Sequence, residues 1–247
     1  MRGLWQLTWL ELKIFLREPM GALGTVMMPA LAFFGASLAG NSIAPARFGS
    51  SEFARVGLPV LAATLMAISA VLSLVTIIAV YREGGILKRL RATPLRPVTI
   101  VTAHVLVKLL LTAVTLVVLA VLGRRAATPP PGASLVSFAV ALLFSTAAIL
   151  SLGFLLASVV RTARFAQPFG ALVLYPMLAL SGVFVPVDSL PRALQAVAQV
   201  LPLTHAVALL QGAWTGVAWS AQLVHVGALV VFAAASAVVA SRVFRWE

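Results

Sequence analysis

The chain has 247 residues, of which 62% are hydrophobic and 10% are charged. Soluble proteins average about 45–50% apolar and 25% charged residues, and a chain of this length buries only about 70–75% of its unfolded surface. Apolar side chains would therefore cover a water-soluble fold, so the composition predicts an integral membrane protein. The absence of cysteine excludes a disulfide framework. The net charge of +12 is typical of basic loops facing anionic lipid, and no nucleic-acid partner is expected.

Residues 1–19 predict an amphipathic helix that lies in the membrane interface. At 100° per residue its cations share one stripe, and Trp5 and Trp9 lie on an adjacent apolar face. Indole rings favour the headgroup level of a membrane. Pro19 favours a break before the apolar segment that follows, and a plain cytoplasmic extension of that segment is the alternative.

Six apolar segments are long enough to cross a membrane as helices, because about 20 residues span about 30 Å of hydrocarbon. We expect an all-α membrane protein with a single transmembrane domain over residues 1–247. The predicted spans are Met20–Gly40, Val56–Val80, Val98–Leu122, Ser134–Val160, Pro168–Val187 and Gln222–Ser241. Twelve Lys and Arg residues lie on the side of both termini and five on the other, which predicts that both termini are cytoplasmic.

The cytoplasmic loop at residues 81–97 carries a small apolar face on a basic segment. In a helix over Ile86–Ala92, Leu87 and Leu90 share one face, while the cations lie mostly away from it. Glycines before this helix permit a turn and prolines after it end the helix. Such a knob fits a groove on another protein, and a loop anchored to lipid by its charge is the alternative.

This loop also resembles the signature of a known family. The pattern Arg82-Glu83-x-Gly85-x-Leu87-x-x-Leu90-x-x-Thr93-Pro94 is similar to the cytoplasmic signature of type-2 ABC exporter permeases. The resemblance implies six spans, with a coupling helix between the second and third that docks on a separate ATP-hydrolysing subunit. The contact with that subunit would then involve Arg82, Glu83, Gly85, Leu87, Leu90, Thr93 and Pro94.

A second block, from Pro176 to Val207, is similar to the fifth span of this family and the re-entrant outer hairpin after it. We expect the hairpin over residues 188–221. Within it, Asp188–Thr204 has apolar residues at helical spacing, is bounded by Pro186 and Pro202, and is too short to cross. This predicts a short amphipathic helix that dips into the outer leaflet, the alternative being an outward loop folded over the surface.

The fifth span carries the candidate gate. Three prolines interrupt it, so we expect a kinked or divided helix; they are Pro168, Pro176 and Pro186. The pathway would be closed at its outer end by Leu180, Val183 and Phe184. Small residues predict that part of a homodimer interface lies on the same span; they are Gly170, Ala171, Ala179, Ser181 and Gly182.

Two further sets of polar residues lie within predicted spans. Ser69 and Ser73 belong to a polar stripe on the second span, which lines a pathway or packs against neighbouring helices. His104 and Lys108 are four residues apart on the third span, and an ionisable pair inside a membrane is a functional candidate. The alternative is that Lys108 extends to the cytoplasmic interface.

No residue pattern predicts catalysis. ATP hydrolysis needs a phosphate cradle of the form G-x-x-x-x-G-K-[ST], which the sequence lacks, so ATP and magnesium are expected on a separate ATPase subunit. The acids lie outside the spans or at their ends, and the three histidines lack metal-ligand spacing. We expect a non-catalytic permease with no cofactor or metal of its own, paired with a second copy or a paralogue.

The sequence and the resemblance together predict an exporter permease in the plasma membrane of a prokaryote. Its expected substrate is hydrophobic or amphiphilic, either a drug-like compound, as in multidrug efflux, or a lipid. Export of a lipid-linked polysaccharide is one alternative. A secondary transporter or channel is another, which would be expected to carry acids in its spans or broken helices in repeated halves. A membrane scaffold is the third.

Overall fold

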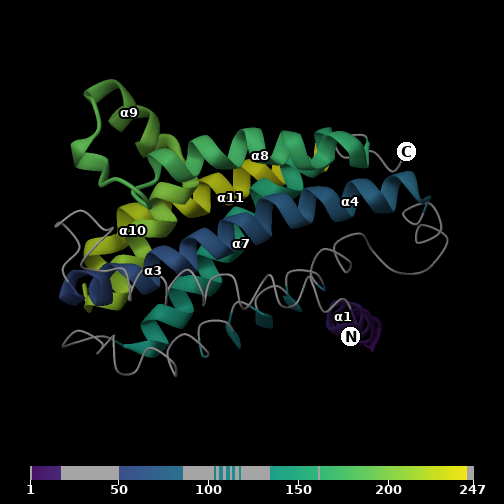
Figure 1. Cartoon of the computed structure of the whole chain (residues 1–247), viewed down its shortest axis with the longest axis horizontal. Coiled ribbons are helices and arrows are strands. Elements are labelled where there is room, and N and C mark those ends of the chain that lie inside the picture. Colours follow the sequence, from purple (N-terminus) through teal and green to yellow (C-terminus); the bar gives the residue numbers. More distant parts are fainter. Residues whose placement is uncertain are drawn as a thin grey trace.

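The computed structural model describes residues 2–17, 50–85, 134–160 and 162–243, together with positions 103, 106, 107, 110, 111, 113, 114 and 117. All regular structure in these residues is helical (Figure 1). The predicted span Met20–Gly40 lies outside them, as do His104, Lys108 and most of the loop at residues 81–97.

From Leu135 to Val243 the helices follow one another along the chain with short connections. The elements are α1 (Arg2–Arg17), α3 (Ser50–Ile68), the π-helical turn η1 (Ser69–Ser73), α4 (Leu74–Glu83), α7 (Leu135–Val159), α8 (Ala163–Leu180), the 3₁₀ turn η3 (Val187–Ser189), α9 (Arg192–Val200), α10 (Pro202–Thr215), the 3₁₀ turn η4 (Trp219–Gln222) and α11 (Leu223–Val243). Because no residue between them leaves the helical state, α3, η1 and α4 form one long rod.

Helix α7 is the centre of the bundle. It contacts α3, η1, α4, α8, α10 and α11. Its 25 residues carry no charge and are apolar on every face, which is typical of a helix surrounded by other helices. The hydroxyl of Ser134 accepts a hydrogen bond from the backbone N–H of Ser137 at 3.3 Å and caps the helix. The predicted helix at Ser134–Val160 is confirmed to within one residue at each end.

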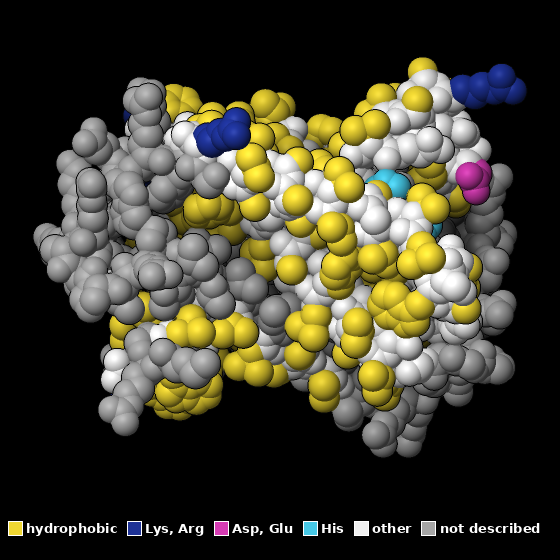
Figure 2. Space-filling model, turned by 180° about the vertical axis from the view of Figure 1, so that it is seen from behind, with side chains coloured by type: hydrophobic (Ala, Val, Ile, Leu, Met, Phe, Trp, Pro, Cys, Tyr) yellow, Lys and Arg dark blue, Asp and Glu magenta, His cyan; other side chains and the backbone are white. Residues whose placement is uncertain are grey.

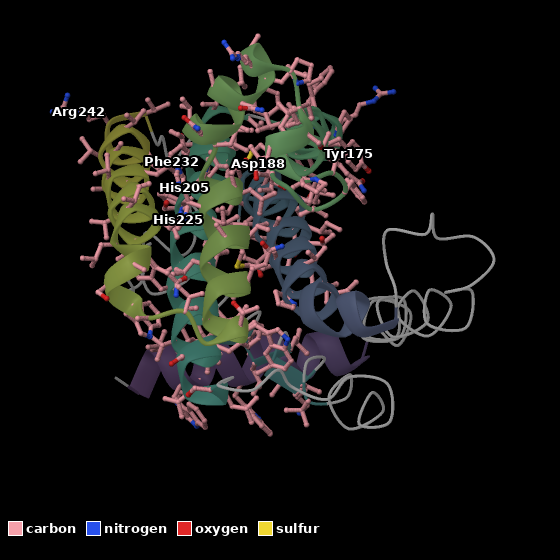
Figure 3. The ribbon with its side chains drawn as sticks, turned by 90° about the vertical axis from the view of Figure 1, so that its left-hand side faces the viewer. Tyr175, Asp188, His205, His225, Phe232 and Arg242 are labelled. Carbon is pink, nitrogen blue, oxygen red and sulfur yellow. The ribbon has the colours of Figure 1, made fainter. Side chains whose placement is uncertain are left out.

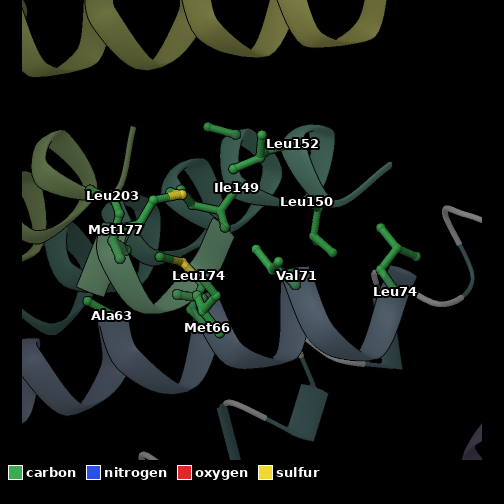
Figure 4. Packing of buried hydrophobic residues seen from close by; sticks show 14 of the residues in the cluster. Ala63, Met66, Val71, Leu74, Ile149, Leu150, Leu152, Leu174, Met177 and Leu203 are labelled. Carbon is green, nitrogen blue, oxygen red and sulfur yellow. The ribbon is translucent and has the colours of Figure 1, made fainter. Parts of the chain in front are cut away.

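The packed core joins five elements. Figure 4 shows the side chains of Met66, Val71, Ile149, Leu174 and Leu203 meeting between the helices that carry them. All five are almost fully buried. In a membrane the lipid is as apolar as these side chains, so close packing rather than exclusion of water holds such helices together. The core therefore fixes the rod of α3 and α4 against α7, α8 and α10.

Three described helical segments are long and apolar enough to cross a membrane: Pro59–Glu83, Leu135–Val159 and Trp219–Ala240. They coincide with the predicted second, fourth and sixth spans. Helices α9 and α10 would add one more if they are counted together as one broken span, bent by 84°. In the predicted third span, Ala103, Val107 and Leu111 are buried at intervals of four residues, as expected for one face of a helix.

Helix α8 differs from the predicted span Pro168–Val187. It begins five residues earlier, at Ala163, and contains Pro168 and Pro176 within one helix, so neither proline divides it. The alternative, a kink at these prolines, stays a prediction. It ends at Leu180 because Gly182 adopts a left-handed conformation, with φ of +86°. By length and composition α8 is not among the segments that qualify as spans.

The small residues expected at a dimer interface are divided between two environments. Gly170 is buried against Leu72, and Ser181 is 1% exposed and donates a hydrogen bond from its hydroxyl to Leu178 O. Both are used inside the chain, so their predicted place at an interface with a second copy is wrong. Ala179 is exposed.

The short helix predicted within Asp188–Thr204 corresponds to α9, Arg192–Val200, which ends just before α10 begins at Pro202. Leu201 takes an extended conformation before Pro202, because the proline ring disfavours a helical residue in front of it. The following helix, α10, is not superficial. It contacts α3, α7 and α11, and the Trp214 ring meets the Phe138 ring edge-on at 5.4 Å. The predicted hairpin over residues 188–221 included these residues, but no packed helix was expected there. The 84° bend between α9 and α10 fits either a broken span or a re-entrant loop, so the re-entrant hairpin stays a prediction.

Many large hydrophobic side chains of the described helices are exposed on the outside of the bundle. Figure 2 shows hydrophobic side chains over the middle of the described face. Trp5 and Trp9 on α1 are 71% and 60% exposed. Most of the surface of these two side chains, on the predicted apolar face of α1, is therefore left uncovered by the rest of the described chain. Such a surface suits a protein that is surrounded by lipid or by another membrane subunit.

Candidate functional site

The C-terminal end of α4 is where the predicted coupling loop begins. The helix ends at Glu83, and the backbone N–H of Gly84 still donates to Val80 O at 2.9 Å. Gly85 follows with φ of +65°, a left-handed conformation that glycine adopts without strain. The helix therefore ends in a turn at Gly84 and Gly85, directly after Arg82 and Glu83.

Arg82 binds the C-terminal end of α7. Its guanidinium donates to the carbonyl oxygen of Val160, and Nη2 donates to Ala157 O at 3.3 Å. The last carbonyl groups of a helix have no partner within the helix and carry partial negative charge. The half-buried guanidinium of Arg82 donates hydrogen bonds to these carbonyl groups, and its positive charge compensates their partial negative charge.

Glu83 binds the N-terminal end of α8. Its Oε1 accepts a hydrogen bond from the backbone N–H of Ala163, the first residue of that helix, at 2.9 Å. Thr162 occupies the N-cap position, but its side chain makes no capping hydrogen bond, and the first turn of α8 contains no acidic residue. The cap of α8 is therefore supplied by a residue 80 positions away in the sequence.

These contacts define the helix-end junction: Arg82 and Glu83 of α4, Ala157 and Val160 of α7, and Ala163 of α8. The sequence singled out Arg82 and Glu83 but not their partners, because the partner atoms belong to the backbone and leave no mark in residue type. The one available signal was that α8 begins at Thr162-Ala163-Arg164 without an acid of its own. Of the other predicted coupling residues, Leu87, Leu90, Thr93 and Pro94 lie outside the described residues.

The predicted pathway serines bound the π-helical turn η1. Ser69 and Ser73 are its first and last residues, and both are half-buried. A Cβ added to Gly153 of α7 would lie 2.2 Å from the Ala70 carbonyl oxygen, so α7 approaches the backbone of this turn closely. π-Helical turns are rare and frequently accompany functional sites. The structure thus places the serines at a wide turn pressed against α7.

The predicted gate residues lie at the opposite end of α8 from the helix-end junction. Leu180 and Val183 are half-buried, and Val183 packs against the core, whereas Phe184 is 64% exposed. The structure therefore places Val183 at the edge of the core and leaves Phe184 outside it.

Two histidines join α10 to α11, as Figure 3 shows for His205 and His225. Their Nδ1 atoms are 3.0 Å apart, and Nε2 of His205 is 2.8 Å from the Gln199 carbonyl oxygen. A carbonyl only accepts, so Nε2 of His205 carries a proton, and in the neutral ring Nδ1 accepts from His225. Within the residues that the structure describes, no group of three or more acidic or histidine side chains is placed to hold a metal ion.

Comparison with known proteins connects this bundle to a family. The model of a family described as ABC-2 type transporter matches residues 2–215. The chain belongs to this family. ABC-2 type permeases are membrane subunits of ABC transporters. The resemblance to type-2 ABC exporter permeases that the sequence predicted is thereby confirmed.

One curated relative shares part of the sequence with this ABC-2 type chain. Nodulation protein J of Rhizobium leguminosarum bv. viciae is 34% identical over 85 residues, which are 34% of this chain and 33% of that protein. The match thus spans one third of the length of the relative. Together with the three described spans, the family match indicates a membrane protein.

Proposed function

We propose that this chain is the permease subunit of an ATP-driven exporter and that a separate ATPase subunit docks on the loop at residues 81–97. The observation that carries the proposal is the helix-end junction. The loop begins where α4 is bonded to the ends of α7 and α8, so a partner that moves the loop acts directly on three helices. Leu87 and Leu90 supply the apolar docking face, and Thr93 and Pro94 close the segment.

The proposed topology has six spans with both termini in the cytoplasm and the protein in the plasma membrane of a prokaryote. The exposed tryptophans of α1 support an interfacial position for that helix. Helices α9 and α10 follow the end of α8 that is remote from the junction, which supports an outer location for this hairpin. The cation count of the loops supports the same orientation.

The proposed substrate is hydrophobic or amphiphilic, a drug-like compound or a lipid. Residues 59–81, 135–159 and 219–240 contain no Lys, Arg, Asp or Glu, so the described spans carry charge only at the junction end of Pro59–Glu83 and offer none along their length to pair with a highly ionic cargo. A second copy of the chain, or a paralogue, completes the pathway. Its proposed boundary includes the exposed Leu172, Tyr175 and Ala179 of α8, with Ser69 and Ser73 lining the route and Leu180, Val183 and Phe184 closing it.

The docking surface is tested by replacing both Leu87 and Leu90 with Asp in the chain reconstituted with its ATPase. We expect insertion to be unchanged, and binding of the ATPase and ATP-driven transport to be lost. The double variant Lys88→Ala/Arg89→Ala is the matched control, because at 100° per residue both side chains lie away from Leu87 and Leu90 in the predicted helix. Normal binding and transport in the Asp variant would refute the docking surface.

The substrate class is tested in the same vesicles with three labelled cargoes: an amphiphilic dye, a phospholipid and a lipid-linked glycan. ATP-dependent movement of the dye or the phospholipid supports the proposal. Movement of the glycan alone would assign the chain to polysaccharide export. Movement of any cargo along an ion gradient without the ATPase would assign it to secondary transport.

A further inference from the structure

The side chains of Arg82 and Glu83 point to opposite helix ends on the two sides of one short connection. Arg82 reaches the carbonyls of Ala157 and Val160, and Glu83 reaches the N–H of Ala163. Only residues 161 and 162 separate Val160 from Ala163 in the chain. Two adjacent residues of α4 therefore hold both ends of the turn between α7 and α8.

The charges of this pair match the polarity of the two helices. A helix presents partial negative charge at its C-terminus and partial positive charge at its N-terminus. The cation is bound at the C-terminus of α7 and the carboxylate at the N-terminus of α8. If the two residues exchanged places, each charge would meet a like partial charge, so the order Arg-Glu is required by the contacts that it makes.

The start of α8 depends on this contact, because Thr162 does not cap the helix and the first turn has no acid. Helix α8 has 18 residues, which at 1.5 Å per residue gives a length of about 27 Å. At its far end the helix stops at Leu180, and Val183 and Phe184 follow after Ser181 and Gly182. If α4 moves at Glu83, it therefore displaces the N-terminal end of α8. The candidate gate residues lie beyond the C-terminal end of the same helix.

We propose that Arg82 and Glu83 are positioning residues inside the permease, which pass movement of the loop to α8, and are not contact residues for the ATPase. This inference rests on the proposed function and narrows the docking surface to the residues after Gly85. Leu87 and Leu90 bind the partner, and Arg82 and Glu83 convert its movement into a shift of the α7–α8 turn.

The inference is tested with graded variants of the full chain in complex with its ATPase. Glu83→Ala removes the acceptor, Glu83→Gln keeps an acceptor oxygen without the charge, and Arg82→Lys keeps the charge with fewer donors. Arg164→Ala is the matched control, because it removes an exposed charge from the first turn of α8 without altering the junction. Each variant also carries Phe184→Cys, which is a unique label because the chain has no other cysteine.

Three quantities are measured: affinity for the ATPase, transport per ATP hydrolysed, and the nucleotide-dependent change in labelling at position 184. For Glu83→Ala we expect unchanged affinity, an efficiency reduced about tenfold, as expected for loss of one charge-assisted hydrogen bond, and no labelling change. Glu83→Gln and Arg82→Lys should give intermediate losses, and Arg164→Ala none. Reduced affinity in Glu83→Ala with normal labelling would overturn the inference in favour of direct contact.

A second measurement separates failure of this inference from failure of the proposed function. In the permease without any ATPase, a cysteine introduced at Thr162 should be labelled faster when Glu83 is replaced by Ala, because the start of α8 has lost its cap. Equal labelling in both backgrounds would overturn the junction itself. If the rate rises but no ATPase stimulates transport, the junction stands and the proposed function fails.

Discussion

Helices α7 and α11 are both apolar and long enough to cross a membrane, yet the chain uses them differently. Half of the apolar segment of α7 is buried inside the chain, against 17% for the segment Trp219–Ala240 that contains α11. Helix α7 contacts six described elements, whereas α11 packs mainly on α7 and α10. Hydropathy therefore identifies both as spans, but it does not tell which one is central and which one faces outward.

The glycines of the bundle show the difference in atomic terms. A Cβ added to Gly153 of α7 would meet backbone, and one added to Gly212 of α10 would meet a flexible side chain. A Cβ added to Gly227 of α11 would meet nothing within 4 Å. Replacing each of these glycines with alanine therefore tests a tightly packed, a moderately packed and an open position in the same way.

The largest effect is expected for Gly153→Ala. Its new Cβ would lie 2.2 Å from the carbonyl oxygen of Ala70, which belongs to the backbone of η1 and moves only if two helices separate. We expect destabilisation of about 1–3 kcal/mol, the usual cost of overpacking. Thermal unfolding in detergent, followed by size-exclusion chromatography, measures it. A melting temperature equal to that of the unaltered protein would contradict the close approach of α7 and η1.

A smaller effect is expected for Gly212→Ala. The new Cβ would lie 2.4 Å from Oε1 of Gln222, which can rotate away but would then release its hydrogen bond from Nε2 to Val217 O, at 3.0 Å. The expected loss is about 0.5–1.5 kcal/mol, that of one hydrogen bond. In a Gln222→Ala background the same substitution should cost less. An equal cost in both backgrounds would show that Gln222 is not the obstacle.

The histidine pair tests the contact between α10 and α11. We expect a double-mutant cycle of His205→Ala and His225→Ala to give a coupling of about 0.6 kcal/mol, typical of hydrogen bonds between membrane helices. The unfolding midpoint of the four proteins supplies the cycle. Strict additivity would mean that the Nδ1 atoms, 3.0 Å apart here, do not share a hydrogen bond.

The smallest effect is expected for Gly227→Ala, which is the control for Gly153→Ala. Among the described residues, no side chain and no backbone of another element lies within 4 Å of the added Cβ, and alanine favours the helical state over glycine, which offsets any small repacking cost. The melting temperature should stay the same or rise slightly. A fall comparable to that of Gly153→Ala would mean that a partner packs against this part of α11.

The sequence predicts α7 almost to the residue because Ser134 caps it and Arg161 follows its end, so composition changes sharply at both boundaries. It misplaces α8 because prolines were weighed as breakers, although the helix accommodates Pro168 and Pro176. It misses α10 because a helix of 14 residues is too short to register as a span and is revealed only by its packing.

The candidate site is predictable in part for a related reason. The pair Arg82-Glu83 was singled out by its resemblance to a family pattern, and the family is confirmed. The partners of the pair are backbone atoms of Ala157, Val160 and Ala163, which any sequence could supply. Such contacts form only where the folded chain brings the end of one helix next to a side chain of another. The residue types alone do not show which helix ends will meet.

The most direct test of the account is the position at which the ATPase touches the permease. A photoreactive residue placed at Leu87, Leu90 or Val217 is activated in intact membranes that contain both subunits. The account predicts adducts with the ATPase from positions 87 and 90 and none from 217, which lies in the α10–α11 connection. An adduct from position 217, or none from 87 and 90, would contradict both the docking surface and the proposed orientation.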